Sequence, residues 1–559
     1  MKSAVAFLFL FLLISFHSAW AQNSEDVHAT GSNLLRVGDG TTNDAIGNAI
    51  DKRYFEEIAN ARIFFQYFSV GLRYEMDDPS EVGRSFQGIR RRWITYRKDQ
   101  LELQAGDVSA LFGRGLAINL FESRPLNYDS WLDGVFAKSE YKVPKQWLDL
   151  DASIGIQGVG GREDFYPIDT TQPVMHFSAQ SANAEFGFFK KQLLLGGTFM
   201  QAFTGTAQPG RNNTTLPTSR MVDQPDFYLD LNSGEFEGFA EWTENRTQVT
   251  QFLGAFADTA HTGHAVYGSL SYSNSFFGLT AEYKNYSYFI HDPGDAYTNV
   301  FSKLPISSPP EVYKDMTYTS ITRTSHAVNF DDEVGYEIEA NITASPHVTI
   351  NLNAAASSAH DKWNAAGVAV DSTSIFPKFH DLGFYPFWEA FAEVEWDFDP
   401  ANDLNYAKIA FHRRSDVIVY NAADPAATDY RWTTTIAGKV QYETTPTESF
   451  LGILEHQWEY DASLTTPDKL RLNELITLQY SFNPTLTFGG ILDLSVQYEN
   501  MPLHLEDNWP QGFISLRLGQ SHTLLASYGA ERGGLNCTGG ICRVVPPFKG
   551  VRLTLTSQI

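Results

Sequence analysis

The sequence predicts an antiparallel β-barrel of the outer membrane, with about 24 strands in a range of about 22 to 26. Three observations predict it. No apolar run of about 18 residues follows the N-terminal stretch, which leaves strands rather than helices to cross a membrane. Apolar and polar residues alternate with a period of two. Short turns alternate with long polar connections, and 41 Phe, 26 Tyr and 11 Trp favour strands and lipid–water interfaces.

The N-terminus reads as a secretory signal peptide. Lys2 supplies the charged start, residues 4–16 form the apolar run, and Ala19-Trp20-Ala21 is a small-x-small cleavage site. The mature chain should therefore begin at Gln22 and be exported to the cell outer membrane of a Gram-negative bacterium. The predicted organisation is a signal peptide at 1–21, an N-terminal segment at 22–52 that forms either a plug or a first strand, and a transmembrane barrel at 53–559.

The alternation of apolar and polar residues is clearest in the C-terminal half. Ile476, Leu478 and Tyr480 share one face of a predicted strand, whereas Thr477 and Gln479 lie on the other. A soluble β-sandwich would alternate in the same way, so this pattern does not by itself predict a membrane protein. The alternation recurs at 334–342, 348–352, 388–398, 432–442, 451–460 and 486–498.

The spacing of turns separates the two alternatives. Outer-membrane barrels have short periplasmic turns and longer extracellular loops. The stretch 244–264 is either an extra hairpin or one loop, which sets the range of strand number. The last strand, 550–555, partly resembles the signal read by the outer-membrane assembly machinery, an expected partner. Short turns are predicted at 232–234, 273–275, 345–346, 445–446, 483–484 and 519–520, and long connections at 289–330, 358–384, 414–429 and 499–511.

The net charge of the chain excludes some classes of partner. A formal net charge of −25 argues against nucleic acid as a partner, because a phosphate backbone needs a basic footprint. A barrel of this size encloses a lumen too wide for strand side chains to fill, so it must hold water or a plug. The run Arg90-Arg91-Arg92 is unexpected, because at least one of three consecutive strand residues must point toward lipid.

Alternation assigns basic residues to the lumen side of early strands and acidic residues to that side of later strands. Opposed clusters of charge select solutes in pores; the alternative is that these charges are merely hydrated. The candidate lumen and constriction residues are Arg62, Arg73, Arg91, Asp107, Arg114, Glu333, Glu337, Glu389, Glu393, Glu395 and Asp493.

Two segments carry a family resemblance. One runs from Gly106 through Gly113-Arg114-Gly115 to Asp133-Gly134-Val135, and the other covers 533–550. Together they resemble a family of uncharacterised outer-membrane proteins from Bacteroidota and neighbouring phyla. The resemblance implies a barrel of unknown function and supplies no catalytic or binding residues.

Two further motifs have structural interpretations. Cys537 and Cys542 flank a Thr-Gly-Gly-Ile turn in an exported protein, which predicts a disulfide that stiffens a hairpin. The glycine-rich stretch 106–115 lacks the Lys-Ser/Thr ending of a phosphate-binding loop. We interpret it as an irregular element that folds into the lumen or caps a strand. No complete metal site, cofactor site or nucleophile elbow is found, so we expect no enzyme activity and no cofactor.

The predicted function is a porin-like channel or transporter for small polar solutes in the lipid of the outer membrane. The alternative is a plugged barrel that acts as a surface binding or scaffold protein and presents its long extracellular loops to a protein partner or ligand. An outer-membrane hydrolase is the third reading. The first two differ in whether the lumen is open.

Overall fold

The computed structural model of the 559-residue chain describes most of its length, and the predicted signal peptide lies outside the described residues. Among these residues, no helix is long and apolar enough to span a bilayer. The described residues are 27–43, 48–81, 85–124, 128–145, 150–165, 174–209, 215–251, 259–288, 306–330, 332–363, 369–399, 401–402, 404–419, 428–464, 469–497, 508–538 and 541–558.

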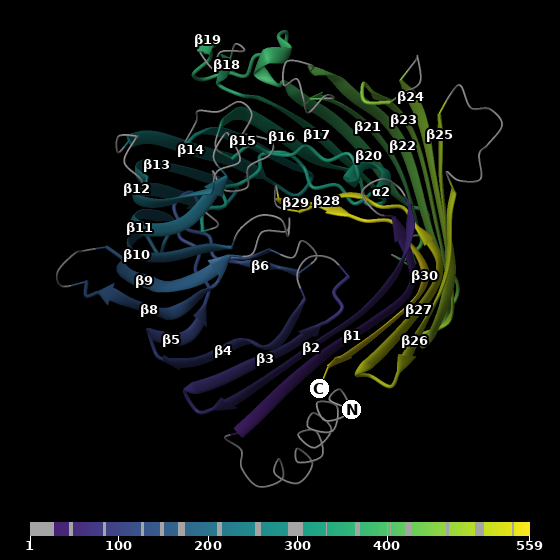
Figure 1. The fold of residues 1–559 in the computed structure, drawn as a ribbon, viewed down its shortest axis with the longest axis horizontal. Helices are drawn as coiled ribbons and strands as arrows, with labels where there is room; N and C mark the ends of the chain where they lie inside the picture. The colour runs from purple at the N-terminus through teal and green to yellow at the C-terminus, as the bar shows by residue number, and fades with distance from the viewer. Residues whose placement is uncertain are drawn as a thin grey trace.

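The fold is a closed antiparallel barrel of 24 strands (Figure 1). Each strand pairs with the next one along the chain, and the last pairs back with the first, which closes the ring. The predicted fold class is confirmed. The strands are β1 (Val27–Asn43), β2 (Ala49–Phe65), β3 (Phe68–Asp77), β4 (Phe86–Lys98), β5 (Leu101–Val108), β8 (Leu132–Val143), β9 (Ala152–Phe165), β10 (Met175–Phe188), β11 (Leu193–Pro209), β12 (Thr215–Ser233), β13 (Phe236–Gln251), β14 (Thr259–Ser273), β15 (Phe277–Ser287), β16 (Asp332–Ser345), β17 (Val348–Ser358), β20 (Phe387–Asp397), β21 (Tyr406–Val419), β22 (Thr428–Thr445), β23 (Glu448–Asp461), β24 (Leu470–Asn483), β25 (Leu486–Gln497), β26 (Asn508–Leu518), β27 (His522–Glu531) and β30 (Phe548–Gln558).

The two rims of the barrel differ as the turn spacing predicts. All six predicted short turns join neighbouring strands at one rim, here called the short-turn rim, where β1 starts and β30 ends. The long connections lie at the other, the long-loop rim. Two of them are shorter than predicted. Strand β21 continues to Val419. Its inward Arg414 and Asp416 are polar, which is why the sequence predicted a loop there. Strand β26 begins at Asn508, in spite of Pro510.

The N-terminal part of the mature chain belongs to the wall of the barrel. Strand β1 pairs with β2 over its whole length and with β30 on its other edge. The segment 22–52 therefore contributes the first strand and the start of the second, and its described residues form no plug. The stretch 244–264 holds the end of β13 and the start of β14.

The outer face of the barrel is apolar. Val135, Ile156, Leu270 and Ile409 are each about 60% exposed, and their strand neighbours on the opposite face are mostly polar. A closed ring of strands satisfies every backbone hydrogen bond without water, which is the condition for crossing a bilayer. The apolar exterior and closed ring are those of an outer-membrane barrel.

A β-bulge explains the run of three arginines on β4. The register between β3 and β4 shifts here, so Arg90 has no strand partner of its own. Such an extra residue redirects the side chains beside it. Arg90 and Arg91 consequently both face the lumen, where both lie beside Asp129. Arg92 alone points outward, and its Nη2 lies 3.3 Å from Asp133 Oδ2.

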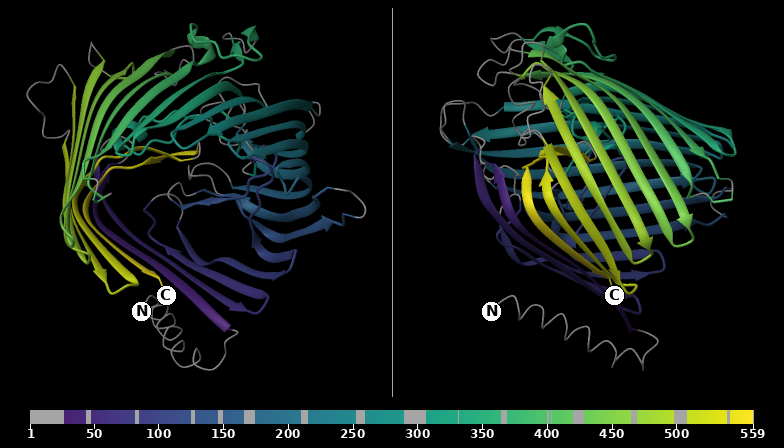
Figure 2. Two further views of the ribbon diagram at one scale, coloured as in Figure 1. Left: turned by 180° about the vertical axis from the view of Figure 1, so that it is seen from behind. Right: turned by 90° about the vertical axis from the view of Figure 1, so that its right-hand side faces the viewer.

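Three connections from the long-loop rim fold into the barrel, and one leans on its outside (Figures 1 and 2). The first inner segment comprises the described residues 109–124 and 128–131, with β6 (Glu122–Ser123) and β7 (Tyr128–Asp129). The second inner segment is 306–330, with α2 (Thr319–Thr322). The third is the hairpin of β28 (Gly534–Thr538) and β29 (Ile541–Val545), and β28 contacts α2. The outer loop comprises the described residues 359–363 and 369–386, with β18 (Asp361–Trp363), β19 (Ala369–Ser372) and η2 (Leu382–Phe384).

Candidate functional site

The first inner segment has a hydrophobic underside that packs on the inner wall. Phe112, Ile118 and Leu120 are almost completely buried and share one apolar cluster with Phe177 of β10 and Met200 of β11. Burial of such side chains stabilises a protein by about 1.5–3 kcal/mol each. The segment is therefore a fixed layer on the inner wall.

The glycine-rich turn of this segment binds a carboxylate of the wall. Glu241 Oε2 accepts a hydrogen bond from the backbone N–H of Arg114 at 2.5 Å, and Oε1 accepts one from that of Leu116 at 3.2 Å. Gly113 has a φ of 57°, and a Cβ there would lie 2.6 Å from Glu241 Oε1. Backbone N–H groups that cradle a phosphate in other proteins are here occupied by the protein's own glutamate.

Ion pairs hold the far end of the first inner segment against β2 and β3. Glu122 Oε2 lies 2.6 Å from Arg73 Nη1, and Arg124 Nη1 lies 3.2 Å from Glu75 Oε2. Arg124 Nη2 also lies 3.4 Å from Glu56 Oε1. All five side chains are at most one-third exposed, so solvent screens these pairs less than it screens surface pairs.

The second inner segment is bound to the opposite part of the wall by hydrogen bonds and ion pairs. Tyr318 donates a hydrogen bond to Glu393 at 2.8 Å. The first N–H groups of α2, those of Thr319 and Ser320, donate to the carboxylate of Glu455 at 3.1 and 2.6 Å. Two cations complete the attachment: Lys314 Nζ lies 2.6 Å from Glu339 Oε2, and Arg323 Nη1 lies 2.5 Å from Asp493 Oδ2.

His326 is the most enclosed ionisable group of the second inner segment. Its Nδ1 lies 2.9 Å from Asp416 Oδ2 and its Nε2 lies 3.1 Å from Glu333 Oε1. Its ring stacks on Phe387 at 4.0 Å. Burial alone would lower the pKa of His326, but the two carboxylates outweigh burial and raise that pKa to about 9. His326 is therefore a cation at neutral pH.

The two inner segments join each other. The backbone N–H of Asn119 donates to the carbonyl of Ile306 at 2.7 Å, and the hydroxyl of Ser307 donates to the carbonyl of Leu116 at 2.6 Å. Together they form one inner lining, which follows the wall from β2 to β25. This inner lining is the candidate functional site, because any solute in the lumen would pass over it.

The eleven residues predicted to line the lumen all lie on the inner side of the barrel or on the inner lining. Most have partners. Arg62 faces the ring of Trp93, Arg114 faces the ring of Phe239, Asp107 pairs with Arg91, Glu333 with Lys284, Glu337 with Asn353, Glu389 with His412, Glu395 with Lys408, and Asp493 with both Arg323 and Arg532. Arg73 and Glu393 bind the inner lining as described above.

The predicted opposition of a basic wall to an acidic wall is wrong. Arg73 and Arg91 have carboxylate partners on their own side of the barrel, and Glu333 and Glu389 have cationic or histidine partners on theirs. These four charges are each paired within a few ångströms, because an unpaired buried charge is far more costly than a paired one.

Sequence reasoning missed several of the carboxylates that bind the inner lining from the wall. Glu56, Glu75, Glu241 and Glu455 lie on strands with many other polar residues, and nothing in their spacing distinguishes them. His326 lies in a long connection without regular structure. For the inner lining itself, only the glycine-rich motif gave a signal: of its two interpretations, folding into the lumen holds for 109–115, whereas 106–108 end the wall strand β5.

The two cysteines are opposite each other in the backbone register of β28 and β29. Their side chains lie outside the described residues, so the disulfide stays a prediction.

Comparisons with known proteins agree with this picture only in outline. The model of a family described as "Family of unknown function (DUF6029)" matches residues 1–559. No curated protein matches the chain. Solved structures with similar folds include the siderophore receptor PirA from Pseudomonas aeruginosa, with 8% identity, a TM-score of 0.43, and coverage of 95% of this chain and 80% of that one. The P pilus usher PapC translocation pore has 9% identity, a TM-score of 0.38 and coverage of 95% and 99%. OccK2 (OpdF) from Pseudomonas aeruginosa, solved with glucuronate, has 12% identity, a TM-score of 0.37 and coverage of 77% and 98%. These similarities are too low to support any argument about function.

Proposed function

We propose that this chain, which belongs to the DUF6029 family of unknown function, is an outer-membrane channel or transporter for small polar solutes. The long-loop rim faces the cell exterior and the short-turn rim faces the periplasm, as in other barrels of this class. Outer-membrane lipid and the assembly machinery are the proposed partners. We also propose that the protein comes from a bacterium of the Bacteroidota type, as the motif resemblance implies.

One observation carries the proposal: the inner lining follows the wall. Its buried side chains pack on successive strands and its charged side chains pair with them, from Glu56 on β2 to Asp493 on β25. A lumen enclosed by 24 strands is too wide for strand side chains alone to fill. A layer on the wall narrows such a lumen and gives it a fixed polar surface, which is the requirement for selecting solutes.

Single-channel conductance tests the proposal. The signal-free protein, refolded and inserted into a planar bilayer with a salt gradient across it, should give stable open steps, and the reversal potential would report its ion preference. A Glu455→Gln variant removes a carboxylate that accepts two N–H bonds of α2. This variant should give larger or noisier steps, because the second inner segment is held less firmly.

The matched control is Asp381→Asn, which removes a carboxylate from the outer loop, outside the lumen. It should conduct like the wild type. A wild-type barrel that inserts but never conducts would contradict the channel and favour the plugged barrel that binds a partner through its long loops.

A further inference from the structure

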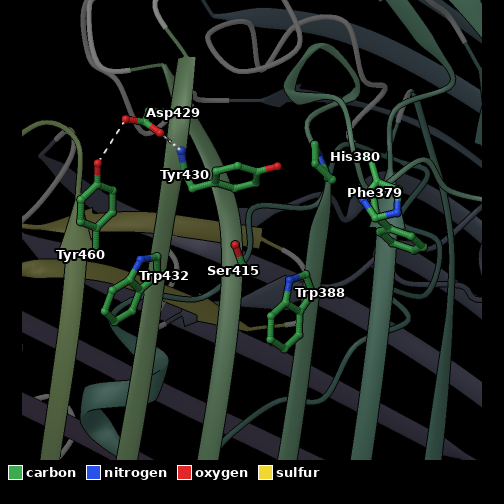
Figure 3. A pocket seen from close by; sticks show the side chains of 9 residues that line it. Phe379, His380, Trp388, Ser415, Asp429, Tyr430, Trp432 and Tyr460 are labelled. Atoms are coloured by element: carbon green, nitrogen blue, oxygen red, sulfur yellow. Dashed lines mark hydrogen bonds between the residues drawn. The ribbon is translucent and has the colours of Figure 1, made fainter.

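The outer wall of the barrel carries a pocket near the long-loop rim (Figure 3). Three of its residues, Trp388, Trp432 and Tyr460, come from β20, β22 and β23. They lie in one row, because Trp388 pairs with Ser415 of β21, Ser415 with Trp432, and Trp432 with Tyr460. Glu389 and Thr433, their strand neighbours, face the lumen. The row therefore faces lipid, away from the proposed transport route.

The outer loop forms the roof of this pocket. Phe379 and His380 lie above and to the right of Trp388 in Figure 3, and Asp429 and Tyr430, at the start of β22, lie above Trp432. Pro386 of the outer loop also lines the pocket. The volume is about 530 Å³, which is within the range of small-molecule sites. Lipid tails fill irregular apolar grooves, but this pocket also presents a carboxylate, an imidazole and a hydroxyl.

The lining combines flat rings with hydrogen-bonding groups. The rings of Trp432 and Tyr460 are nearly parallel, at 10°, with centroids 5.9 Å apart. The face of an aromatic ring is electronegative and attracts the weakly positive C–H groups of a ligand. Asp429 accepts a hydrogen bond from Tyr460 at 3.3 Å, and it can accept further bonds from ligand hydroxyls. A sugar has both C–H faces, which stack on aromatic rings, and hydroxyl groups, which donate hydrogen bonds to oxygens. The lining of this pocket therefore complements a sugar.

A cation stands beside the aromatic row. Arg413 belongs to β21, two residues before Ser415, so it shares the outward face. Its guanidinium carbon lies 4.3 Å from the centroid of the Trp432 ring. Guanidinium groups bind phosphates with directional hydrogen bonds. An outward arginine beside a pocket of rings and hydrogen-bonding groups, on the lipid-facing side of the barrel near its rim, fits a sugar that carries phosphate and is anchored in lipid.

We propose that this pocket binds the phosphorylated sugar headgroup of a glycolipid in the outer leaflet. The aromatic row would stack on the sugar, Asp429 would accept hydroxyl bonds, and Arg413 would bind the phosphate. This site is independent of the proposed channel, and a barrel that does not conduct could still have it.

Native mass spectrometry of the detergent-solubilised barrel tests the proposal with three probes: purified lipopolysaccharide, phosphatidylethanolamine, and the delipidated oligosaccharide of the same lipopolysaccharide. The wild type should retain lipopolysaccharide in preference to the phospholipid. Trp432→Leu should lower this retention about tenfold, because it removes the central ring of the row. Arg413→Gln should lower it by a smaller factor and serves as the second variant if Trp432→Leu does not fold.

Trp396→Leu is the matched control. Trp396 lies on β20 with the same outward orientation as Trp388, is 53% exposed, and is outside the pocket, so its loss should leave retention unchanged. Equal retention of the phospholipid, or equal retention by all variants, would overturn the proposal. Binding of the free oligosaccharide as strong as that of the intact glycolipid would show a soluble glycan site instead and would also overturn it.

Discussion

The second inner segment and the outer loop flank the same pair of strands, β16 and β17, yet they fold to opposite sides of the wall. Lys314, Arg323 and His326 of the inner segment all bind carboxylates of the barrel. The two lysines of the outer loop pair within the loop, Lys362 with Asp381 at 2.6 Å and Lys378 with Asp371 at 2.8 Å. Its one ionisable contact with the barrel among the described residues is that of His360, whose Nδ1 lies 2.7 Å from Asp332 Oδ1 of β16.

Hydrogen bonds to its backbone carbonyls also attach the outer loop to the barrel. Tyr283 donates a hydrogen bond to the carbonyl of Ile375 at 2.9 Å, and Asn285 donates to that of Ser374 at 2.7 Å. The difference follows from the two faces of one sheet. The inner face offers carboxylates, so a connection rich in cations is held there. The outer face near the rim offers aromatic rings and amides, with Asp332 bound by His360, so the two lysines of the loop that lies on it find their carboxylates within the loop.

The comparison predicts that the largest loss of stability follows Glu333→Gln. Lys284 is about 1% exposed, and its Nζ lies 3.0 Å from Glu333 Oε1. The substitution leaves this buried cation without its carboxylate, and Glu333 also binds His326. We expect the free energy of unfolding to fall by about 3–5 kcal/mol, measured by urea unfolding in lipid vesicles. A change below about 1 kcal/mol would show that the inner segment does not depend on these charges.

A pH dependence of slightly smaller size should follow from His326. Its pKa of about 9 in the folded protein is above its ordinary value of 6.5, so folding favours the protonated form. The resulting stability is fully present below about pH 6.5 and is lost as the pH rises through about 9, a loss of about 3 kcal/mol. Urea unfolding at pH 6 and pH 10 should show this difference in the wild type, and His326→Gln should remove most of it. An unchanged difference in the variant would assign the effect to other groups.

The smallest effect is expected on the outer loop. The side chains of Lys362 and Asp381 are 36% and 43% exposed, and exposed pairs contribute little. Asp381→Asn should change the free energy of unfolding by less than about 0.5 kcal/mol in the same urea assay. A loss as large as that of Glu333→Gln would remove the distinction between the two connections.

Much of the barrel could be predicted from the sequence because period-two alternation and turn spacing are local signals. The strand at 476–482 and the turn at Asn483-Pro484 are read from a few adjacent residues. Polar residues on the lumen side misled the same reasoning at β21, where Arg414 and Asp416 belong to a strand. The bulge at Arg90 could not be predicted from local patterns, because a bulge depends on the register of two strands.

The site was less accessible than the fold because its contacts join residues distant in sequence. Alternation correctly gave the inward direction of Glu393 and Asp493. It could not show that Tyr318 and Arg323, in a connection more than 70 residues earlier, would be their partners. The predicted field across the lumen failed for the same reason, since neighbouring strands and the inner lining both supply partners to charges such as Arg91 and Glu333.

The pairing of β1 with β30 imposes an order on assembly. Thr42 donates a hydrogen bond to the carbonyl of Pro547, 505 residues later in the chain, and the two strands are joined along most of their length. Until the last strand arrives, both edges of the sheet expose unpaired backbone groups, which a bilayer does not tolerate. An intermediate that lacks only β30 is thus no more ready for the lipid than one that lacks half the strands. Both leave edges unpaired, so the pairing of β30 with β1 is the step that makes the sheet compatible with lipid.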